Sequence, residues 1–265
     1  MCLCAAAIGV DANWPVVLVG NRDEFFSRPT QPLHRWEARP LLAGKDLVAG
    51  GTWLAIDPTS GRWAALTNVR QQADANQQYQ TRGVLIPQTI CADDIWASMQ
   101  QLRHQTHKYL PFNLIAGDAT QAYTLGSQQQ QLAHLKPPFV RTLSNCCLSI
   151  FWHKQRHLQQ DLHALLAQSH NLSGIDLLHR CAQMMRQAPL HIDQPSAGDD
   201  SAAAITKGRF LISENYGTRS TTVVLWRSAD EYLLLEIQYC ANNGAVATTT
   251  LCRKEANSQE IWVTT

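Results

Sequence analysis

The sequence has few charged residues, and their signs almost balance. Charged side chains make up 16% of the 265 residues, against a usual share of about 25%. Lys and Arg together number 22 and Asp and Glu 21, which gives a formal net charge of +1. Proteins that bind nucleic acid or anionic membranes usually carry a clustered basic excess. We therefore expect neither nucleic acid nor a membrane surface as the partner.

A long uninterrupted apolar segment is also missing. A membrane-spanning helix needs about 20 consecutive apolar residues. The longest candidate, residues 2–20, is interrupted by Asp11, Asn13 and Pro15. No Lys or Arg precedes Arg22, so the basic start of a secretory signal peptide is absent. These features predict a cytoplasmic protein without a membrane span.

The cysteine and histidine residues show no ligand or disulfide pattern. None of the eight cysteines belongs to a C-x-x-C pair or a haem-attachment motif. Cys4 and Cys181 lie in apolar runs, as small buried side chains do. The histidine pairs at 104 and 107 and at 153 and 157 are typical of a polar surface. We expect a reducing compartment and no metal site.

Short apolar runs joined by turn-forming residues predict four β-hairpins. The paired runs are residues 3–10 with 16–20, 52–56 with 62–67, 112–117 with 122–126, and 221–226 with 232–239. Helices are predicted in two pairs, at 82–91 with 93–103 and at 154–168 with 173–187. Asp93 and Ser173 are the expected N-caps of two of these helices.

Hairpins that alternate with helix pairs predict the α+β class, with antiparallel sheets covered by helical layers. No change in composition marks a boundary within residues 1–265. We therefore expect one domain over the whole length. The pattern gives no information on the oligomeric state.

Cys2 is the first candidate for a chemical role. A small residue after the initiator methionine permits removal of Met1, which would leave a thiol and an α-amine on Cys2. The α-amine has an ordinary pKa of about 8, so part of it is neutral at pH 7 and could accept the thiol proton. The same position also suits a residue that merely begins a buried strand, and position alone favours that role.

The charged cluster, defined as residues 21–24, follows the second apolar run. A solvated turn is its ordinary interpretation. Alternatively, Arg22 could lower the pKa of a nearby thiol or hold a carboxylate. Asp23 or Glu24 could orient an α-ammonium group, and the residues alone leave that choice open.

Two asparagines and an arginine adjoin other predicted strands. Asn68 follows the run ending at Thr67, and Asn145 follows residues 142–144. Asparagine often forms turns, but its amide can also stabilise negative charge that develops on a carbonyl oxygen. Arg219, just before the run at 221–226, is either a surface charge or a second guanidinium beside a nucleophile.

Several short motifs follow one another along nearly the whole chain. They are Met1-Cys2, Asn21-Arg22-Asp23-Glu24-Phe25, Ser27-Arg28-Pro29, Gly50-Gly51-Thr52-Trp53-Leu54, Ala64-Ala65-Leu66-Thr67-Asn68, Phe112-Asn113-Leu114-Ile115, Leu143-Ser144-Asn145 and Tyr216-Gly217-Thr218-Arg219. In content and order they resemble the NRDE family, the family of transport-and-Golgi-organisation protein 2. That family is similar in turn to cysteine N-terminal-nucleophile hydrolases such as bile salt hydrolase and penicillin V acylase.

The resemblance implies an αββα sandwich of the N-terminal-nucleophile hydrolase type. Cys2 corresponds by position to the nucleophile, Asn68 and Asn145 to the oxyanion-hole asparagines, and Arg219 to the later active-site arginine. In the hydrolases an arginine precedes the catalytic aspartate by three positions. Here the aspartate at position 23 follows Arg22 directly, so either it or the next residue would hold the amine.

The resemblance also implies two competing functions. One is hydrolysis of a non-peptide amide C–N bond in a small acylated molecule, with Cys2 attacking the carbonyl and no cofactor required. The other is carriage of haem or a lipid in the same pocket without turnover, because family members are implicated in haem mobilisation and in lipid or Golgi homeostasis. We expect the hydrolase, with the carrier as its alternative.

Overall fold

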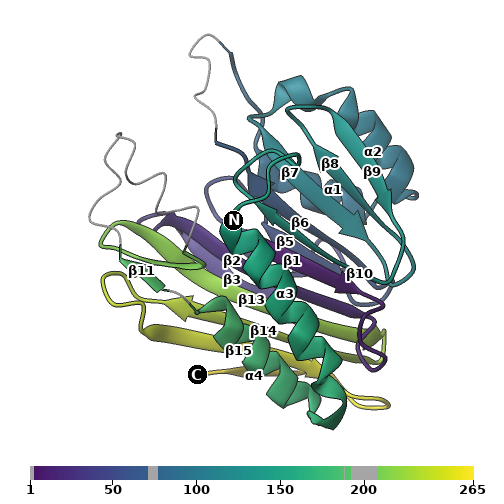
Figure 1. Cartoon of the computed structure of the whole chain (residues 1–265), viewed down its shortest axis with the longest axis vertical. Coiled ribbons are helices and arrows are strands. Elements are labelled where there is room, and N and C mark those ends of the chain that lie inside the picture. Colours follow the sequence, from purple (N-terminus) through teal and green to yellow (C-terminus); the bar gives the residue numbers. More distant parts are fainter. Residues whose placement is uncertain (1–2, 71–76, 188, 192–207) are drawn as a thin grey trace.

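The computed structural model describes residues 3–70, 77–187, 189–191 and 208–265 (Figure 1). Two seven-stranded antiparallel sheets form most of it. The first sheet has the order β10 (Phe139–Ser144), β1 (Leu3–Ile8), β2 (Val16–Phe25), β13 (Tyr216–Ser228), β14 (Glu231–Tyr239), β15 (Val246–Lys254) and β16 (Ile261–Thr264).

The second sheet runs in chain order, as successive hairpins do. It consists of β3 (Thr30–Arg35), β4 (Leu42–Asp46), β5 (Leu54–Asp57), β6 (Arg62–Asn68), β7 (Phe112–Gly117), β8 (Ala122–Gly126) and β9 (Gln131–Leu135). The short strands β11 (Pro189–His191) and β12 (Phe210–Ile212) form a small parallel pair beside the first sheet.

The described helices lie on the outer faces of the sheets (Figure 1). On the first sheet these are α3 (His153–Ala167), η3 (Ser169–Asn171) and α4 (Gly174–Met185). On the second sheet, α1 (Leu85–Ile90) and α2 (Ile95–Arg103) cover the outer face, flanked by the 3-10 turns η1 (Arg82–Val84) and η2 (Thr106–Lys108). Helices and antiparallel sheets together confirm the predicted α+β class.

Successive side chains of a strand point to opposite faces of its sheet, and apolar side chains on both faces form three apolar layers. On β1, Cys4 and Ala6 face a core shared by the two sheets, whereas Leu3 and Ala5 face α3 and α4. A third cluster joins the second sheet to α1 and α2, with Phe112 fully buried within it. Each sheet is therefore apolar on both faces, and polar side chains on the inner face need partners there.

The predicted helices form, with two differences at their starts. Leu158, Leu162 and Leu166 face the core from α3, and Ser173 caps α4 by accepting from the Asp176 backbone. The cap of α2 is Asp94, one residue after the predicted one, and its side chain accepts from the backbone N–H of residue 97. The segment predicted as one helix from residue 82 begins with the 3-10 turn η1 and becomes α-helical at residue 85.

Candidate functional site

The charged cluster lies inside strand β2, so its interpretation as a solvated turn was wrong. β2 extends over ten residues, Val16–Phe25, and pairs with β1 on one side and β13 on the other. β13 pairs with all four residues of the cluster and the described part of β1 with Asn21, and the side chains of the cluster alternate between the two faces. Arg22 and Glu24 face inward, toward the second sheet, whereas Asn21 and Asp23 face the side covered by α4 and β12.

Arg22 is held by contacts on three sides. Its Nη2 lies 2.7 Å from Asp46 Oδ2, and its Nη1 donates to Thr30 Oγ1 at 2.7 Å. Its guanidinium carbon lies 4.4 Å from the centre of the Trp53 ring, within range of a cation–π contact. Burial lowers the pKa of Arg22, and the charge of Asp46 opposes that shift. Arg22 is therefore a fixed, charge-balanced group with only 3% of its surface exposed.

Asp46, at the end of β4, joins two arginines. Arg28 Nε lies 2.6 Å from the same Oδ2 that contacts Arg22, and 3.8 Å from Glu24 Oε2. Burial alone would raise the pKa of Asp46, but the hydrogen bond from Arg28, a backbone N–H and the charge of Arg22 outweigh it and lower the pKa. The result is a network of two guanidinium groups and two carboxylates.

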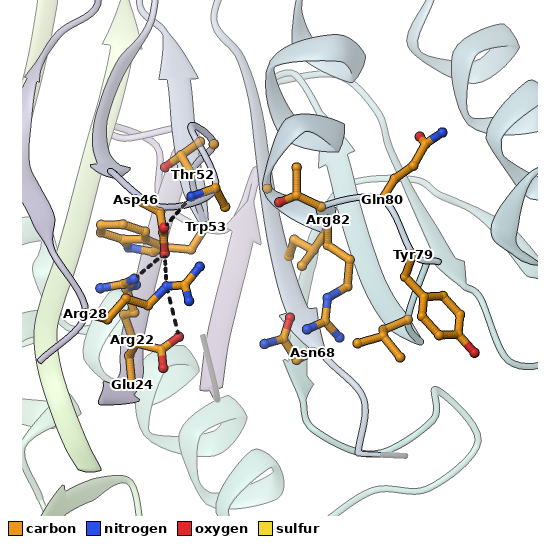
Figure 2. A pocket seen from close by; sticks show the side chains of 16 residues that line it. Arg22, Glu24, Arg28, Asp46, Thr52, Trp53, Asn68, Tyr79, Gln80 and Arg82 are labelled. Carbon is orange, nitrogen blue, oxygen red and sulfur yellow. Dashed lines mark hydrogen bonds and ion pairs between the residues drawn. The ribbon is translucent and has the colours of Figure 1, made fainter. Parts of the chain in front are cut away.

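This network forms one wall of a cavity of about 340 Å³ between the two sheets. Figure 2 shows Asn68, Tyr79 and Arg82 on the opposite wall. Trp53, beside Arg22 in Figure 2, and Gly51 also line the cavity. Polar groups that converge on a concave site fix the orientation of a small-molecule ligand, and the several charges in this lining suit a polar ligand.

The two predicted asparagines meet at one junction. Asn68 ends β6 and lines the cavity. Asn145 follows β10 and is buried, and its Nδ2 donates to the backbone carbonyl of Asn68 at 2.7 Å. The backbone carbonyl of Asn145 in turn accepts from Arg70 N at 3.1 Å. Residues 77 positions apart in the sequence are thus brought together, although Asn145 is not among the residues that line the cavity.

Asn113 holds this junction, and our sequence analysis gave it no role. Its buried Nδ2 donates to the backbone carbonyls of Ser144 at 3.0 Å and Cys146 at 2.7 Å, on either side of Asn145. Thr67 Oγ1 donates to the same Ser144 carbonyl at 2.7 Å. The sequence did carry a signal for this role, because Asn113 is a polar residue among apolar ones in the motif at residues 112–115.

Asp23 and Arg219 are not among the residues that line the cavity. Asp23 is buried, and its Oδ1 accepts from Thr218 Oγ1 at 2.7 Å. Arg219 is the extra residue where the register of β13 against β2 shifts, and such bulges redirect side chains. Its Nη1 donates to the backbone carbonyls of Phe25 and Arg28. Burial and the nearby positive charge of the buried arginine in β2 lower its pKa.

Cys2 lies outside the described residues, which begin beside it at Leu3. Leu3 pairs with Asn21 on β2 and with Ser144 on β10. The residues that follow these two partners in the sequence are Arg22, within β2, and Asn145, just after β10. The described start of β1 therefore lies between two of the predicted site residues.

The described residues show neither a metal centre nor a membrane helix. No three histidine, cysteine, aspartate or glutamate side chains within them are grouped as a metal site would require. Among the described helices, none combines the length and the apolar character needed to cross a bilayer.

Comparison with known proteins identifies the family. A model of the family Transport and Golgi organisation 2 matches residues 1–240. The human Transport and Golgi organization protein 2 homolog is 28% identical over 229 residues, which cover 79% of this chain and 81% of that protein. The mouse homolog is 27% identical over the same length and coverage. The Drosophila melanogaster protein is 25% identical over 262 residues, 88% of this chain and 89% of its own. The chain therefore belongs to the Transport and Golgi organisation 2 family.

Proposed function

We propose that this protein is a cysteine N-terminal-nucleophile amidohydrolase acting on a small acylated molecule. The observation that carries the proposal is the pairing of Leu3 with both Asn21 and Ser144. Leu3, the residue after Cys2 in the sequence, thereby lies beside the residues that directly precede Arg22 and Asn145. The cavity lined by Arg22 and Asn68 lies at the same place and offers room for a substrate.

The arrangement of layers supports the same proposal. Two antiparallel sheets share an inner core, and the described helices cover their outer faces. This order agrees with an αββα sandwich of the N-terminal-nucleophile hydrolase type, in which we include residues 1–265 as one domain. The inner core draws on both sheets, which favours a single unit.

The reaction begins when the Cys2 thiol gives its proton to its own α-amine and the sulfur bonds to the amide carbonyl carbon. Negative charge moves to the carbonyl oxygen, where Asn68 and Asn145 serve as donors. The ammonium then gives its proton to the leaving nitrogen, and the C–N bond breaks. Water attacks the thioester, the amine takes its proton, and release of the acid restores the thiol. No cofactor takes part in these steps.

Two arginines contribute differently to the thiolate. Arg22 is paired with Asp46, so much of its charge is balanced. Arg219 donates to neutral oxygens and forms no ion pair among the residues that the structure describes. Glu24 and Asp46 act on its charge without forming an ion pair, so that charge is less balanced than that of Arg22 and is the stronger influence on the pKa of a nearby thiol.

The test compares Cys2→Ala and Asn68→Ala with wild type on a panel of N-acyl amides, after mass spectrometry has established removal of Met1. Loss of the nucleophile should abolish turnover, and loss of one oxyanion donor should lower kcat about a hundredfold or more. Cys147→Ala is the matched thiol control, because its half-buried side chain lies outside the cavity lining. Turnover that survives in Cys2→Ala, or a wild type inactive on the whole panel, would refute the proposal.

Carriage of haem or a lipid in the same cavity is the alternative, and the lining disfavours it. The described residues that line the cavity include no histidine, cysteine or methionine, and among them Tyr79 alone is of a type that ligates haem iron. A histidine, His107, does line a second cavity of about 370 Å³, but that cavity has only Tyr79 in common with the first. The charged walls also suit a small polar molecule better than the long apolar tails of a lipid.

A further inference from the structure

We infer that Arg82 is an anion-binding residue, so that the ligand of the cavity carries a carboxylate or phosphate group next to its reacting carbonyl. The statement about the reacting carbonyl rests on the proposed function. The statement that Arg82 binds an anion rests on the cavity alone. Arg82 belongs to η1 and lies on the opposite wall from the network around Asp46 (Figure 2).

The first argument is charge. Three arginines and two carboxylates line the cavity. Asp46 contacts Arg22 at 2.7 Å and Arg28 at 2.6 Å, and Glu24 lies 3.8 Å from Arg28. Arg82 forms no ion pair within the described part of the chain, and its one hydrogen bond runs from Nη1 to the Pro111 carbonyl at 3.0 Å. It therefore retains donors and a positive charge for a ligand.

The second argument is burial. Arg82 is only partly exposed, and burial lowers the pKa of its guanidinium, with the charge of Glu24 acting in the opposite direction. A half-buried cation without an ion pair raises the free energy of the empty site. An anionic ligand group would compensate that charge, so it gains more at Arg82 than at an exposed arginine.

The third argument is position. Thr52 N donates to the Gly83 carbonyl at 3.1 Å, and a Cβ on Gly51 would lie 2.3 Å from the carbonyl carbon of Gly83. The loop after β4 therefore packs directly on the backbone of Gly83. This contact fixes the position of the backbone from which the Arg82 side chain extends. In Figure 2 the side chain extends toward Asn68, the proposed oxyanion donor. The anion would thus lie close to the carbonyl that reacts.

Binding of three chain-matched probes tests the inference: hexanoate, hexyl phosphate and the neutral hexanamide, each titrated calorimetrically into wild-type protein at 0.15 M salt. At least one anion should bind about tenfold or more tightly than hexanamide. The anion that binds more tightly than hexanamide shows whether the site prefers a carboxylate or a phosphate group. Arg82→Gln should remove the preference, Arg82→Lys should retain part of it, and Arg103→Gln, which deletes an exposed charge on α2, should keep it. Melting temperatures check that each variant folds.

Equal binding of all three probes to wild type, or an undiminished preference in Arg82→Gln, would overturn the inference. Turnover of amides separates it from the proposed function. Anion binding through Arg82 without turnover leaves the inference standing and removes the hydrolase. If Arg82→Gln lowers kcat equally for charged and neutral amides, Arg82 stabilises the transition state and does not select an anionic ligand.

Discussion

Replacing Asp46 by Asn should destabilise the protein more than the loss of an ordinary ion pair. Asp46 Oδ2 lies 2.7 Å from Arg22 Nη2 and 2.6 Å from Arg28 Nε. The Arg22 side chain is 4% exposed, whereas that of Arg28 is 32% exposed. Removal of one partner of a buried pair costs about 3–5 kcal/mol because the other charge stays buried. The exposed contact adds at most about 1 kcal/mol. Together these give an expected loss of about 3–6 kcal/mol in the free energy of unfolding at pH 7.

Urea denaturation of wild type and Asp46→Asn measures this loss. Glu231→Gln is the control, because it breaks the Arg227–Glu231 pair, whose side chains are 38% and 29% exposed. That variant should lose no more than about 1 kcal/mol. If Asp46→Asn loses no more than the control, the network around Asp46 does not stabilise the fold and our account of it fails.

The pH dependence supplies a second check with a definite sign. The pKa of Asp46 in the folded protein lies below its ordinary value of 3.8. Its contribution is therefore fully present above pH 3.8 and is lost as the pH falls through the lowered folded pKa. The difference between wild type and Asp46→Asn should be constant near neutral pH and should shrink only in acid. A difference that shrank between pH 8 and pH 6 would require another titrating group.

Three further predictions concern the neighbours of this network. Asn113→Ala should cost about 1–3 kcal/mol in urea denaturation and should lower kcat more than it changes KM, because the buried Cys146 carbonyl loses the Asn113 donor while the Ser144 carbonyl keeps the Thr67 hydroxyl; unchanged stability would contradict this. Asp23→Asn and Glu24→Gln should differ in kcat by about tenfold or more, because the two carboxylates face opposite sides of β2 and only one can hold the α-amine; equal losses would contradict it. Gly51→Ala should weaken anion binding, whereas Gly50→Ala, with a φ of +68° and open space around it, should lower only stability, by about 1–2 kcal/mol; calorimetry that gave equal affinities in both would contradict the packing argument.

Elements with a strong internal pattern could be predicted from the sequence. The leucines of α3 recur at helical spacing and form one apolar face of the helix. Such a face is buried against a sheet, as it is here. The hairpin of β7 and β8 is two apolar runs about a turn at Asp118, whose carboxylate accepts from the Thr120 and Gln121 backbones. In both cases local physics and tertiary packing require the same structure.

Elements that depend on distant partners could not be predicted. β3 contains Pro32 and His34 and has little alternation, yet it pairs with β4 and its Leu33 backbone donates to the buried Glu236 at 2.8 Å. Arg82 appeared as the start of a helix, because nothing local indicates that its side chain reaches a cavity. The packing of Gly51 against Gly83 likewise links segments that the sequence separates. Such contacts exist only after the sheets have assembled.

The charged cluster shows why sequence position misled the interpretation. Four consecutive polar residues ordinarily indicate a turn, but here each has its own partner on one of two covered faces. Asn21 donates to the carbonyls of residues 185 and 209, Arg22 contacts Asp46, and Asp23 accepts from a threonine hydroxyl on β13. Glu24 lies 3.8 Å from the Arg28 guanidinium.

Stability alone does not account for this composition. Replacing a buried ion pair with well-packed apolar side chains is often neutral or stabilising, so a strand of the first sheet would fold at least as well with apolar residues at these positions. The inner members of the cluster instead line the cavity, where their charges face the space available to a ligand. The polar strand is therefore best explained by what it presents to that cavity, and the network around Asp46 is the arrangement that allows it to remain buried.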